Sequence, residues 1–346
     1  MGITEKIYLE LKKKLEQNSY QAGSKFPSES QLAEEFSVNK MTMNKIVSRL
    51  AGEGYLIRGV RGAGTRVAHK NAGTLGSIAF LSPLSPYAVR ILQGVYAEAK
   101  RQNFSVIIET PAVDEIFQRL QLLQSSGICG VISVAYGLPA VPENLPLFCV
   151  DNEPFPGVTP TENLHFIDSD NYMGGVRMMS EIFRHGHRDI LLFCSEHPNA
   201  LFSAAKAPRV CGFHQVMLEH GVTDFEERTC YSAPESLEDA KTFLRTFLKK
   251  YPQTTLIATD SDNSAATIHA AALSLGIECP GKIALTGFGN ITSLPIASVD
   301  QHPERQGELA ARGVIEKFHH PESSFPLVEF VEASLVNTEL IPIILN

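Results

Sequence analysis

Apolar residues recur at helical spacing at the start of the chain, which predicts an amphipathic helix. Lysines 12–14 lie on the polar side of this pattern. Gly23 and Pro27 then interrupt it, so we expect the helix to end before them. The apolar positions that define the helix are Ile3, Ile7, Leu11 and Leu15.

Two shorter helical patterns follow, each after a residue that can cap a helix. Ser28 precedes one and Asn39 precedes the other, and their side-chain oxygens can accept a free backbone N–H at a helix start. Gly54 ends the second pattern. We expect both Met41 and Met43 to pack inside rather than contact nucleic-acid bases. The two patterns are formed by Leu32, Ala33 and Phe36, and by Met43, Ile46, Val47 and Leu50.

A hairpin is predicted directly after these helices. The β-prone runs 55–58 and 65–67 flank the glycine-rich stretch Gly59-Val60-Arg61-Gly62-Ala63-Gly64. Glycines allow a backbone to approach another molecule closely. Three helices followed by a hairpin are the parts of a winged helix-turn-helix domain, in which the second helix of the motif enters the major groove of DNA.

From residue 75 the pattern changes to short apolar strands alternating with amphipathic helices. Continuous apolar strands that alternate with helices predict parallel sheets covered on both faces. Two such runs predict an α/β body of two lobes with a cleft between them, and ligands of such sheets gather at the carboxyl ends of the strands. The expected strands are 78–81, 106–108, 131–134, 147–150, 190–193, 256–258 and 283–286.

Charge separates the same two parts of the chain. Of 346 residues, 44% are hydrophobic and 20% are charged, which is typical of a globular protein with a substantial core. The overall net charge is −8, but residues 1–70 carry +5 and the remainder carries −13. A basic first part on an acidic body indicates that only the first part meets a polyanion.

Membrane, export and disulfide signals are not found in the sequence. No apolar run reaches the roughly 18 residues that a membrane helix needs. Glu5 and Glu10 lie among the first lysines, and there is no signal-peptide core, so we expect a cytoplasmic protein without membrane contact. The six cysteines are scattered without a C-x-x-C pair, which favours reduced thiols in the core over disulfides or a zinc site.

Residues 26–67, FPSESQLAEEFSVNKMTMNKIVSRLAGEGYLIRGVRGAGTRV, resemble the winged-helix domain of the GntR family of bacterial repressors. The P-S-E start, V-x-x-x-T helix, L-x-x-E-G-Y-L exit and G-x-G-T wing occur in the family's order. Asn44 stands where the family usually has arginine, and Ala63 replaces a basic wing residue. The resemblance implies double-stranded operator DNA as a partner. The residues that we predict to contact DNA are Ser28, Lys40, Thr42, Asn44, Lys45, Arg61, Gly62 and Thr65.

The body resembles the effector domain of the LacI family, which shares the fold of periplasmic sugar-binding proteins. Together the two resemblances are similar to the architecture of the arabinose-repressor subfamily, although arabinose itself does not follow. They imply a homodimer that binds a small carbohydrate-like effector and needs no cofactor or metal. The motifs that carry the LacI resemblance are IDSDNYMGG (167–175), HGHRDILLF (185–193), APRVCGF (207–213), TDSDNSA (259–265), LTGFGN (285–290) and SVDQHPERQGELAA (298–311).

The LacI resemblance also implies the ligand contacts. Arg209 matches the family arginine, whose planar donors suit paired oxygens. Asp262 matches the acidic residue of the N-D-x-x-A motif, and carboxylates accept from sugar hydroxyls. Ser261 and Gly289 depart from the family pattern, so the ligand can differ from a typical hexose or pentose. The predicted ligand residues are Arg209, Asp262, Asp260, Asn290, Tyr87, Phe202 and Tyr136, with Asp151 and Gln301 as weaker candidates.

An enzyme is the alternative that we keep open. The chain has no G-x-S-x-G, Walker A or G-x-G-x-x-G motif, and the resemblance puts His185 and His187 in a helix-to-strand connection rather than a metal site. A sugar- or nucleoside-processing enzyme with an accessory DNA-binding module remains possible. Turnover of a bound ligand would favour it, whereas reversible binding without turnover would reject it.

The expected organisation is a mixed α/β chain with three parts. Residues 1–68 form the winged helix-turn-helix domain, 69–75 the linker and 76–346 the effector domain. Lobe 1 covers about 76–172 and 300–322, and lobe 2 about 173–299 and 323–346. We predict a ligand-responsive transcription regulator, with repression relieved by the ligand as the favoured polarity.

Overall fold

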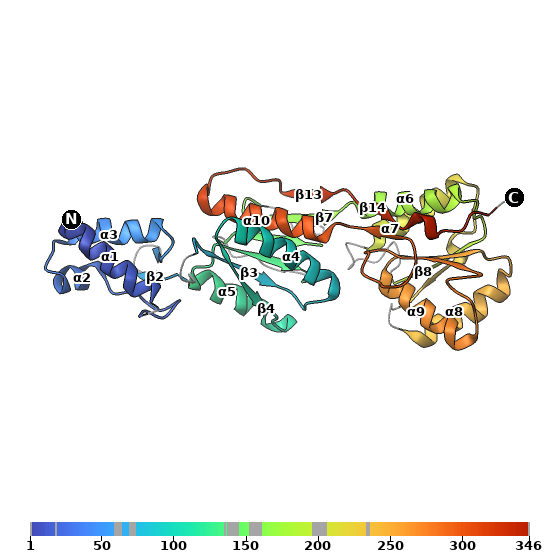
Figure 1. The fold of residues 1–346 in the computed structure, drawn as a ribbon, viewed down its shortest axis with the longest axis horizontal. Helices are drawn as coiled ribbons and strands as arrows, with labels where there is room; N and C mark the ends of the chain where they lie inside the picture. Colours follow the sequence, from blue (N-terminus) through green and yellow to red (C-terminus); the bar gives the residue numbers. More distant parts are fainter. Residues whose placement is uncertain are drawn as a thin grey trace. The chain divides into compact units, whose positions relative to one another are not determined.

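A computed structural model describes residues 2–17, 19–58, 64–68, 74–134, 136, 145–151, 161–195, 206–232 and 236–344. The N-terminal domain has three helices and an antiparallel pair of strands (Figure 1). The elements are α1 (Ile3–Glu16), α2 (Glu29–Glu35), α3 (Lys40–Gly52), β1 (Leu56–Arg58) and β2 (Thr65–Val67). The predicted helices and hairpin strands are therefore confirmed.

Both predicted caps are present and explain where α2 and α3 begin. Ser28 Oγ accepts the backbone N–H of Gln31 at 3.2 Å, and Gln31 Oε1 accepts the backbone N–H of Ser28 at 2.9 Å, which completes a capping box. Asn39 Oδ1 accepts the backbone N–H of Thr42 at 2.7 Å. These local bonds hold the two helices of the motif in their predicted register.

The inner faces of the three helices form one apolar core. Leu11, Leu32, Met43 and Leu50 are each fully buried in it. The prediction that Met41 also packs inside is wrong, since its side chain is 72% exposed. Two residues along a helix rotate a side chain by about 200°, so the burial of Met43 turns Met41 outward.

The chain divides into two compact units. The first contains residues 1–150, 158–166 and 307–327, and therefore includes the N-terminal domain. The second contains residues 151–157, 167–306 and 328–346. The chain passes from one unit to the other near residues 151, 158, 167, 307 and 328. The last three of these positions lie a few residues from the lobe boundaries expected from the sequence.

The first unit supplies β3, β4, β5, β6 and the start of β7 to a sheet that also contains β13, whose residues belong to the second unit. The overall strand order is β13-β7-β6-β5-β3-β4, with β3 parallel to β4 and β5, and β5 parallel to β6. Helices α4 and α10 cover one face and α5 the other (Figure 1). The bounds are β3 (Ser77–Leu81), β4 (Ser105–Glu109), β5 (Gly130–Val134), β6 (Leu147–Val150), β7 (Leu164–Ser169), β13 (Val328–Val331), α4 (Pro86–Arg101), α5 (Ile116–Ser126) and α10 (Pro303–His319).

The second unit repeats this plan with four parallel strands in the order β11-β10-β8-β9. Alternate strand residues serve two separate cores. Leu192 and Ala258 face α6 and α7, whereas Leu191 and Ile257 face α8 and α9 (Figure 1). The bounds are α6 (Asn171–Arg184), β8 (Ile190–Cys194), α7 (Lys206–Glu219), β9 (Thr229–Tyr231), α8 (Leu237–Lys250), β10 (Leu256–Thr259), α9 (Asp262–Leu275) and β11 (Ala284–Thr286).

The seven predicted body strands coincide with β3, β4, β5, β6, β8, β10 and β11. Other short elements were not predicted. Antiparallel strands β12 (Ser298–Asp300) and β14 (Ser334–Val336) form a separate pair. The 3-10 helices are η1 (Val113–Glu115), η2 (Glu226–Arg228) and η3 (Thr338–Leu340).

His185 and His187 lie between α6 and β8, as predicted, and both contact the C-terminal segment. His185 Nδ1 lies 2.7 Å from the carbonyl oxygen of Ile341, and His187 Nε2 lies 2.9 Å from that of Pro342. The second nitrogen of His187 lies 2.8 Å from Thr255 Oγ1. The two imidazoles therefore tie the end of the chain to the second unit.

The cysteines are free thiols in mixed surroundings. Cys149 and Cys279 are buried, and burial raises the pKa of each to about 12. Cys211 is exposed, so the prediction of core thiols is wrong for this residue, which lies on the outer side of α7. Within the described ranges, none of the helices has the length and apolar character needed to cross a bilayer.

Candidate DNA-binding surface and effector site

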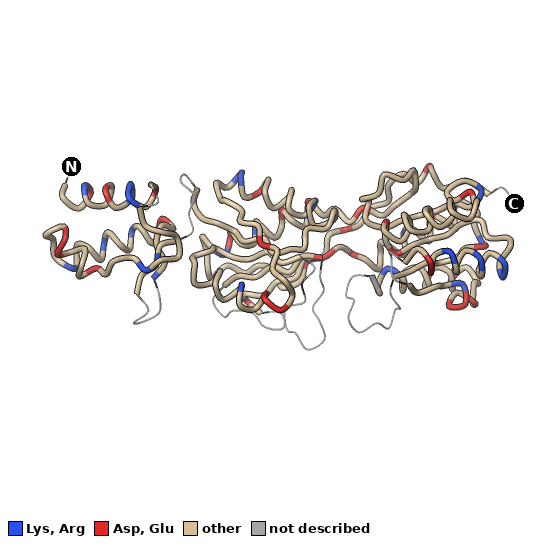
Figure 2. The backbone as a smooth tube through the Cα atoms, turned by 90° about the horizontal axis from the view of Figure 1, so that it is seen from below, with Lys and Arg blue, Asp and Glu red and all other residues tan. Residues whose placement is uncertain are grey.

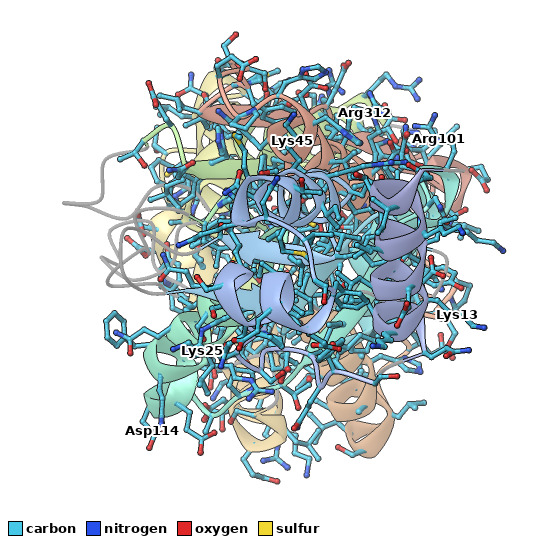
Figure 3. All side chains as sticks on the ribbon, turned by 90° about the vertical axis from the view of Figure 1, so that its left-hand side faces the viewer. Lys13, Lys25, Lys45, Arg101, Asp114 and Arg312 are labelled. Atoms are coloured by element: carbon cyan, nitrogen blue, oxygen red, sulfur yellow. The ribbon has the colours of Figure 1, made fainter. Side chains whose placement is uncertain are left out.

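Helix α3 presents a polar side opposite its buried side. Lys40 and Lys45 are exposed there, while Thr42 and Asn44 are half-buried. Figure 3 views the N-terminal domain end-on, with Lys45 labelled on α3 and Lys13 on α1. The residues that we predicted from the second helix therefore share the solvent side of one element.

The charges of the N-terminal domain are mixed along the chain (Figure 2). Lys12 pairs with Glu53 at 3.0 Å, and Arg49 pairs with Glu5 at 2.9 Å. The bond to Glu53 raises the pKa of Lys12. In contrast, the described part of the chain holds no ion pair to Lys40 or Lys45. Because paired cations are already neutralised, these two lysines are the better candidates for contacts with phosphate.

Three predicted DNA residues meet around one hollow of about 480 Å³. Ser28, Lys40 and Thr65 line it from the start of α2, the start of α3 and the start of β2. Arg58 and Glu29 also line it, but these two residues are paired with each other at 2.7 Å. Lys40 and the hydroxyls of Ser28 and Thr65 are therefore the donors in the hollow that are suited to a phosphate group. Arg61 and Gly62 lie outside the described residues.

Asn44 is held by two residues that the sequence analysis did not assign. Its Nδ2 lies 3.0 Å from each carboxylate oxygen of Glu29. Arg58 donates to Glu29 Oε1 at 2.7 Å and to the main-chain oxygen of Asn44 at 3.3 Å. Glu29 belongs to the P-S-E motif and Arg58 to the predicted wing, but their contact is between residues 29 apart and no local pattern predicts it.

In the second unit, polar residues gather where the parallel strands end. Ser195 follows β8 and Asp260 follows β10, the two central strands. Asp260 Oδ2 accepts the backbone N–H and the hydroxyl of Ser195, both at 2.7 Å, and its Oδ1 accepts the hydroxyl of Ser264 at 3.1 Å. The strand order reverses between β8 and β10, and ligands of open α/β sheets bind at such points.

Arg209 points from α7 to this strand end. It is only 4% exposed, and its guanidinium carbon lies 4.2 Å from the ring centroid of Phe288. Its Nε donates to Asn171 Oδ1 at 2.8 Å, and its Nη1 donates to the main-chain oxygen of Asp260 at 3.0 Å. No bond from Nη2 occurs among the described residues. The guanidinium is thus fixed on two sides, with one nitrogen left to bind another oxygen.

Glycines allow the close approach of α6 and α7 that places Arg209. A methyl group on Gly175 would lie 2.3 Å from the main-chain oxygen of Arg209. One on Gly212 would lie 2.4 Å from the main-chain oxygen of Tyr172. Backbone atoms cannot yield easily, so only glycine fits at these two contacts.

The predicted ligand residues Asp262 and Asn290 are engaged within the protein. Asp262 Oδ2 accepts the backbone N–H of Ile291 at 2.6 Å and of Thr292 at 3.1 Å, and its Oδ1 accepts the hydroxyl of Ser298 at 2.8 Å. Asn290 Nδ2 donates to Asp300 at 2.8 Å. A carboxylate has about four acceptor sites, so Asp262 keeps at most one for a ligand.

Two of the aromatic candidates, Tyr87 and Tyr136, belong to the first unit, and the third is not described. Tyr136 is 6% exposed, and its hydroxyl donates to the carbonyl of Pro111 at 2.8 Å, which is the environment of a packing residue. Tyr87 is half-buried in α4 of the first unit. Phe202 lies outside the described residues, and Asp151 begins the second unit.

Asn171, which the sequence analysis did not assign, and Gln301, which it gave as a weaker candidate, both bond within the polar network around Arg209. Asn171 Oδ1 accepts from both Arg209 and Gln301, the latter at 3.1 Å. Gln301 is 2% exposed and also donates to Ser169 at 3.3 Å. Both residues lie within motifs quoted for the LacI resemblance, so the motifs contained a signal for the polar network around Arg209.

Two protein-family models match the chain. The model described as bacterial regulatory proteins, gntR family, matches residues 3–67. The model of the periplasmic binding protein-like domain matches residues 180–338. These matches confirm the predicted domain types at both ends of the chain.

Individual proteins are similar to large parts of the chain. The ribose operon repressor of Bacillus subtilis (strain 168) is 22% identical over 299 residues, which cover 81% of this chain and 84% of the repressor. The structure of the transcriptional regulator CelR–cellobiose complex has a TM-score of 0.62 at 17% identity and covers 90% of this chain and 98% of that one. A LacI family transcriptional regulator from Enterococcus faecium with bound ribose has a TM-score of 0.60 at 16% identity, covering 75% and 96%. The structures share the fold.

Proposed function

Since the chain is a transcription regulator that joins a GntR-family domain to a periplasmic-binding-protein-like domain, we propose that it binds operator DNA and responds to a carbohydrate-like effector. The N-terminal domain contacts the duplex with α3 in the major groove. Lys40 and the hollow beside it bind a phosphate group. Lys45 adds a further contact from the same side of α3.

We propose the effector site at the strand ends around Arg209. The observation that carries this proposal is the buried guanidinium, which two bonds hold in place while Nη2 keeps its donors. Paired hydroxyl oxygens of a sugar suit such a planar donor. Asn171 and Gln301 hold the guanidinium in position. The names of the relatives, a ribose repressor and a regulator bound to cellobiose, favour a carbohydrate over other small molecules.

Effector and operator influence each other through a coupling of about 1–3 kcal/mol, which is typical of allosteric proteins. We propose that the effector weakens operator binding, that the protein acts as a homodimer on paired half-sites and that it works in the cytoplasm without turnover of the effector. A dimer fits a palindromic operator, because each basic domain meets one half-site.

Arg209→Gln tests the effector site. A ligand that binds only the native state raises its melting temperature, so a thermal-shift screen of monosaccharides, disaccharides, sugar phosphates and nucleosides identifies the effector with the unchanged protein. In the variant we expect the shift to disappear, while affinity for a selected operator stays within about twofold.

Arg177→Gln is the matched control, because Arg177 lies in the same unit and pairs with the exposed Glu332, which is not a residue of the Arg209 cluster. This control should keep the thermal shift. An unchanged response of Arg209→Gln would reject the site. Conversion of the effector to a product during incubation would reject a purely binding function.

A further inference from the structure

The orientation of the Asn44 side chain is fixed by its neighbours. Its Nδ2 lies 3.0 Å from both oxygens of the Glu29 carboxylate. A carboxylate beside an arginine accepts hydrogen bonds and donates none, so the amide nitrogen must face Glu29 and the oxygen Oδ1 must face away. The two ends of the amide are therefore distinguished by chemistry.

Arg58 holds this arrangement from the other side. It donates to Glu29 Oε1 at 2.7 Å and to the main-chain oxygen of Asn44 at 3.3 Å. The side chain of Glu29 is 22% exposed and that of Arg58 is 41% exposed, so the network lies at the surface of the domain. Among the described residues, Oδ1 of Asn44 has no hydrogen-bond donor.

An acceptor at this place changes what the helix can recognise. In the major groove, cytosine N4 and adenine N6 are amino donors, whereas guanine presents only the acceptors O6 and N7 and thymine presents O4 and a methyl group. The arginine that the GntR family usually has at this position is a donor and suits guanine. Because the Nδ2 of Asn44 is bonded to Glu29, Asn44 offers an acceptor to the groove instead of a donor.

We propose that Asn44 is a specificity-determining residue whose Oδ1 selects an amino-bearing base, cytosine or adenine, at one position of each operator half-site. Glu29 and Arg58 are positioning residues that keep the oxygen turned toward the DNA. This inference rests on the proposed operator binding by α3. Cytosine and adenine both carry an exocyclic amino group, and the base pair that is selected shows which of the two bases Asn44 contacts.

Selection from a pool of random DNA duplexes, followed by sequencing, tests the proposal with the full-length protein. The unchanged protein should enrich one base pair at one position of each half-site, and removing the exocyclic amino group of the cytosine or adenine in that pair should weaken binding about as much as Asn44→Ala does. Asn44→Ala should lose that preference by roughly 5- to 100-fold, the usual effect of one mismatched base pair, and keep the preferences at all other positions. Asn44→Arg should shift the same position to guanine.

Glu29→Gln separates a positioning role from a merely structural one. Its amide can donate as well as accept, so Asn44 is free to turn, and we expect the base preference to broaden at the same position while the melting temperature changes little. Lys45→Ala is the matched control on α3. It should weaken binding to all sequences alike and reduce the slope of log affinity against log salt by about 0.9, without altering any base preference.

The outcomes distinguish this inference from the proposed function. If the unchanged protein selects no sequence, operator binding and this inference both fail. If it selects a site and Asn44→Ala selects the same site with equal preference, only the role of Asn44 is overturned. Unchanged binding to a duplex that lacks the exocyclic amino group of the cytosine or adenine at the position that Asn44→Ala relaxes would also overturn it.

Discussion

The residues of the proposed DNA-binding surface and those of the Arg209 cluster differ in their spacing along the chain and in their burial. The predicted DNA residues lie within about forty consecutive residues, and most are exposed or half-buried. The Arg209 cluster draws on segments near 171, 195, 209, 260 and 301, and its polar side chains are nearly all buried. At a local, exposed site a single substitution can change which groups are offered to a ligand, and Asn44, which stands where the GntR family usually has arginine, is an example. A buried cluster depends on the packing of helices around it.

The largest effect that we expect comes from Gly175→Ala. The added methyl group meets the main-chain oxygen of Arg209 at 2.3 Å, so α6 and α7 must separate. Overpacking of this kind costs about 1–3 kcal/mol and sometimes more. We expect the second unit to lose about 3 kcal/mol of stability and effector binding to fail. Hydrogen exchange on the intact protein, followed by mass spectrometry, should show faster exchange in β8 and β10 and unchanged exchange in α1 and α3.

Gly276→Ala is the control for this comparison. Gly276 ends α9 at a φ of +68° with open space around it, so alanine costs only about 1 kcal/mol of backbone strain there. Equal destabilisation by both substitutions would show that the α6–α7 contact is not special. Faster exchange in α1 and α3 would show that the two regions are not independent.

Asp262→Asn sharpens the distinction between a ligand residue and a structural one. The carboxylate of Asp262 accepts two backbone N–H groups and the Ser298 hydroxyl, whereas an uncharged amide has one oxygen, which gives the backbone N–H groups a weaker acceptor and makes the Ser298 hydroxyl turn around to accept. We expect a loss of about 1–3 kcal/mol in the free energy of unfolding, which denaturant titration measures. Asp114→Asn, at an exposed residue of η1, should cost nothing measurable. Stability equal to that of the unchanged protein, together with lost effector binding, would restore Asp262 as a primary ligand residue.

The fold was predictable where periodicity and caps act locally. Ser28, Asn39 and the apolar positions predicted the three N-terminal helices, and continuous apolar runs predicted seven strands of the two parallel sheets but not β7, β9 or β13. Strands β12 and β14 were not predicted, because they are three residues long and pair across more than thirty positions. Short paired strands carry too few residues to show an alternating pattern.

The sites were predictable only as residue types. Family motifs led to Arg209 and Asp260, but they did not show that Asp262 accepts three donors from its own chain. Nor did they show that Glu29 and Arg58 hold Asn44. Such bonds join residues that are distant in sequence, and their geometry arises only after the helices and strands have packed.

Acidification should have the smallest effect on stability, and it should lower the stability of the body but not that of the N-terminal domain. Residues 1–68 contain no histidine, whereas the body contains His165 and His187, and burial lowers the pKa of both from the ordinary value of 6.5. As the pH falls below about 6.5, the unfolded chain binds protons before the folded chain does, so the body loses stability while a histidine-free domain does not. Hydrogen exchange at pH 7.5 and pH 5.8, corrected for intrinsic exchange rates, should show faster opening in β7 and β8 but not in α3. His187→Asn should reduce the change in β8, because the titrating group is gone. Equal acceleration in α3 would contradict a histidine origin and would remove the contrast between the two regions.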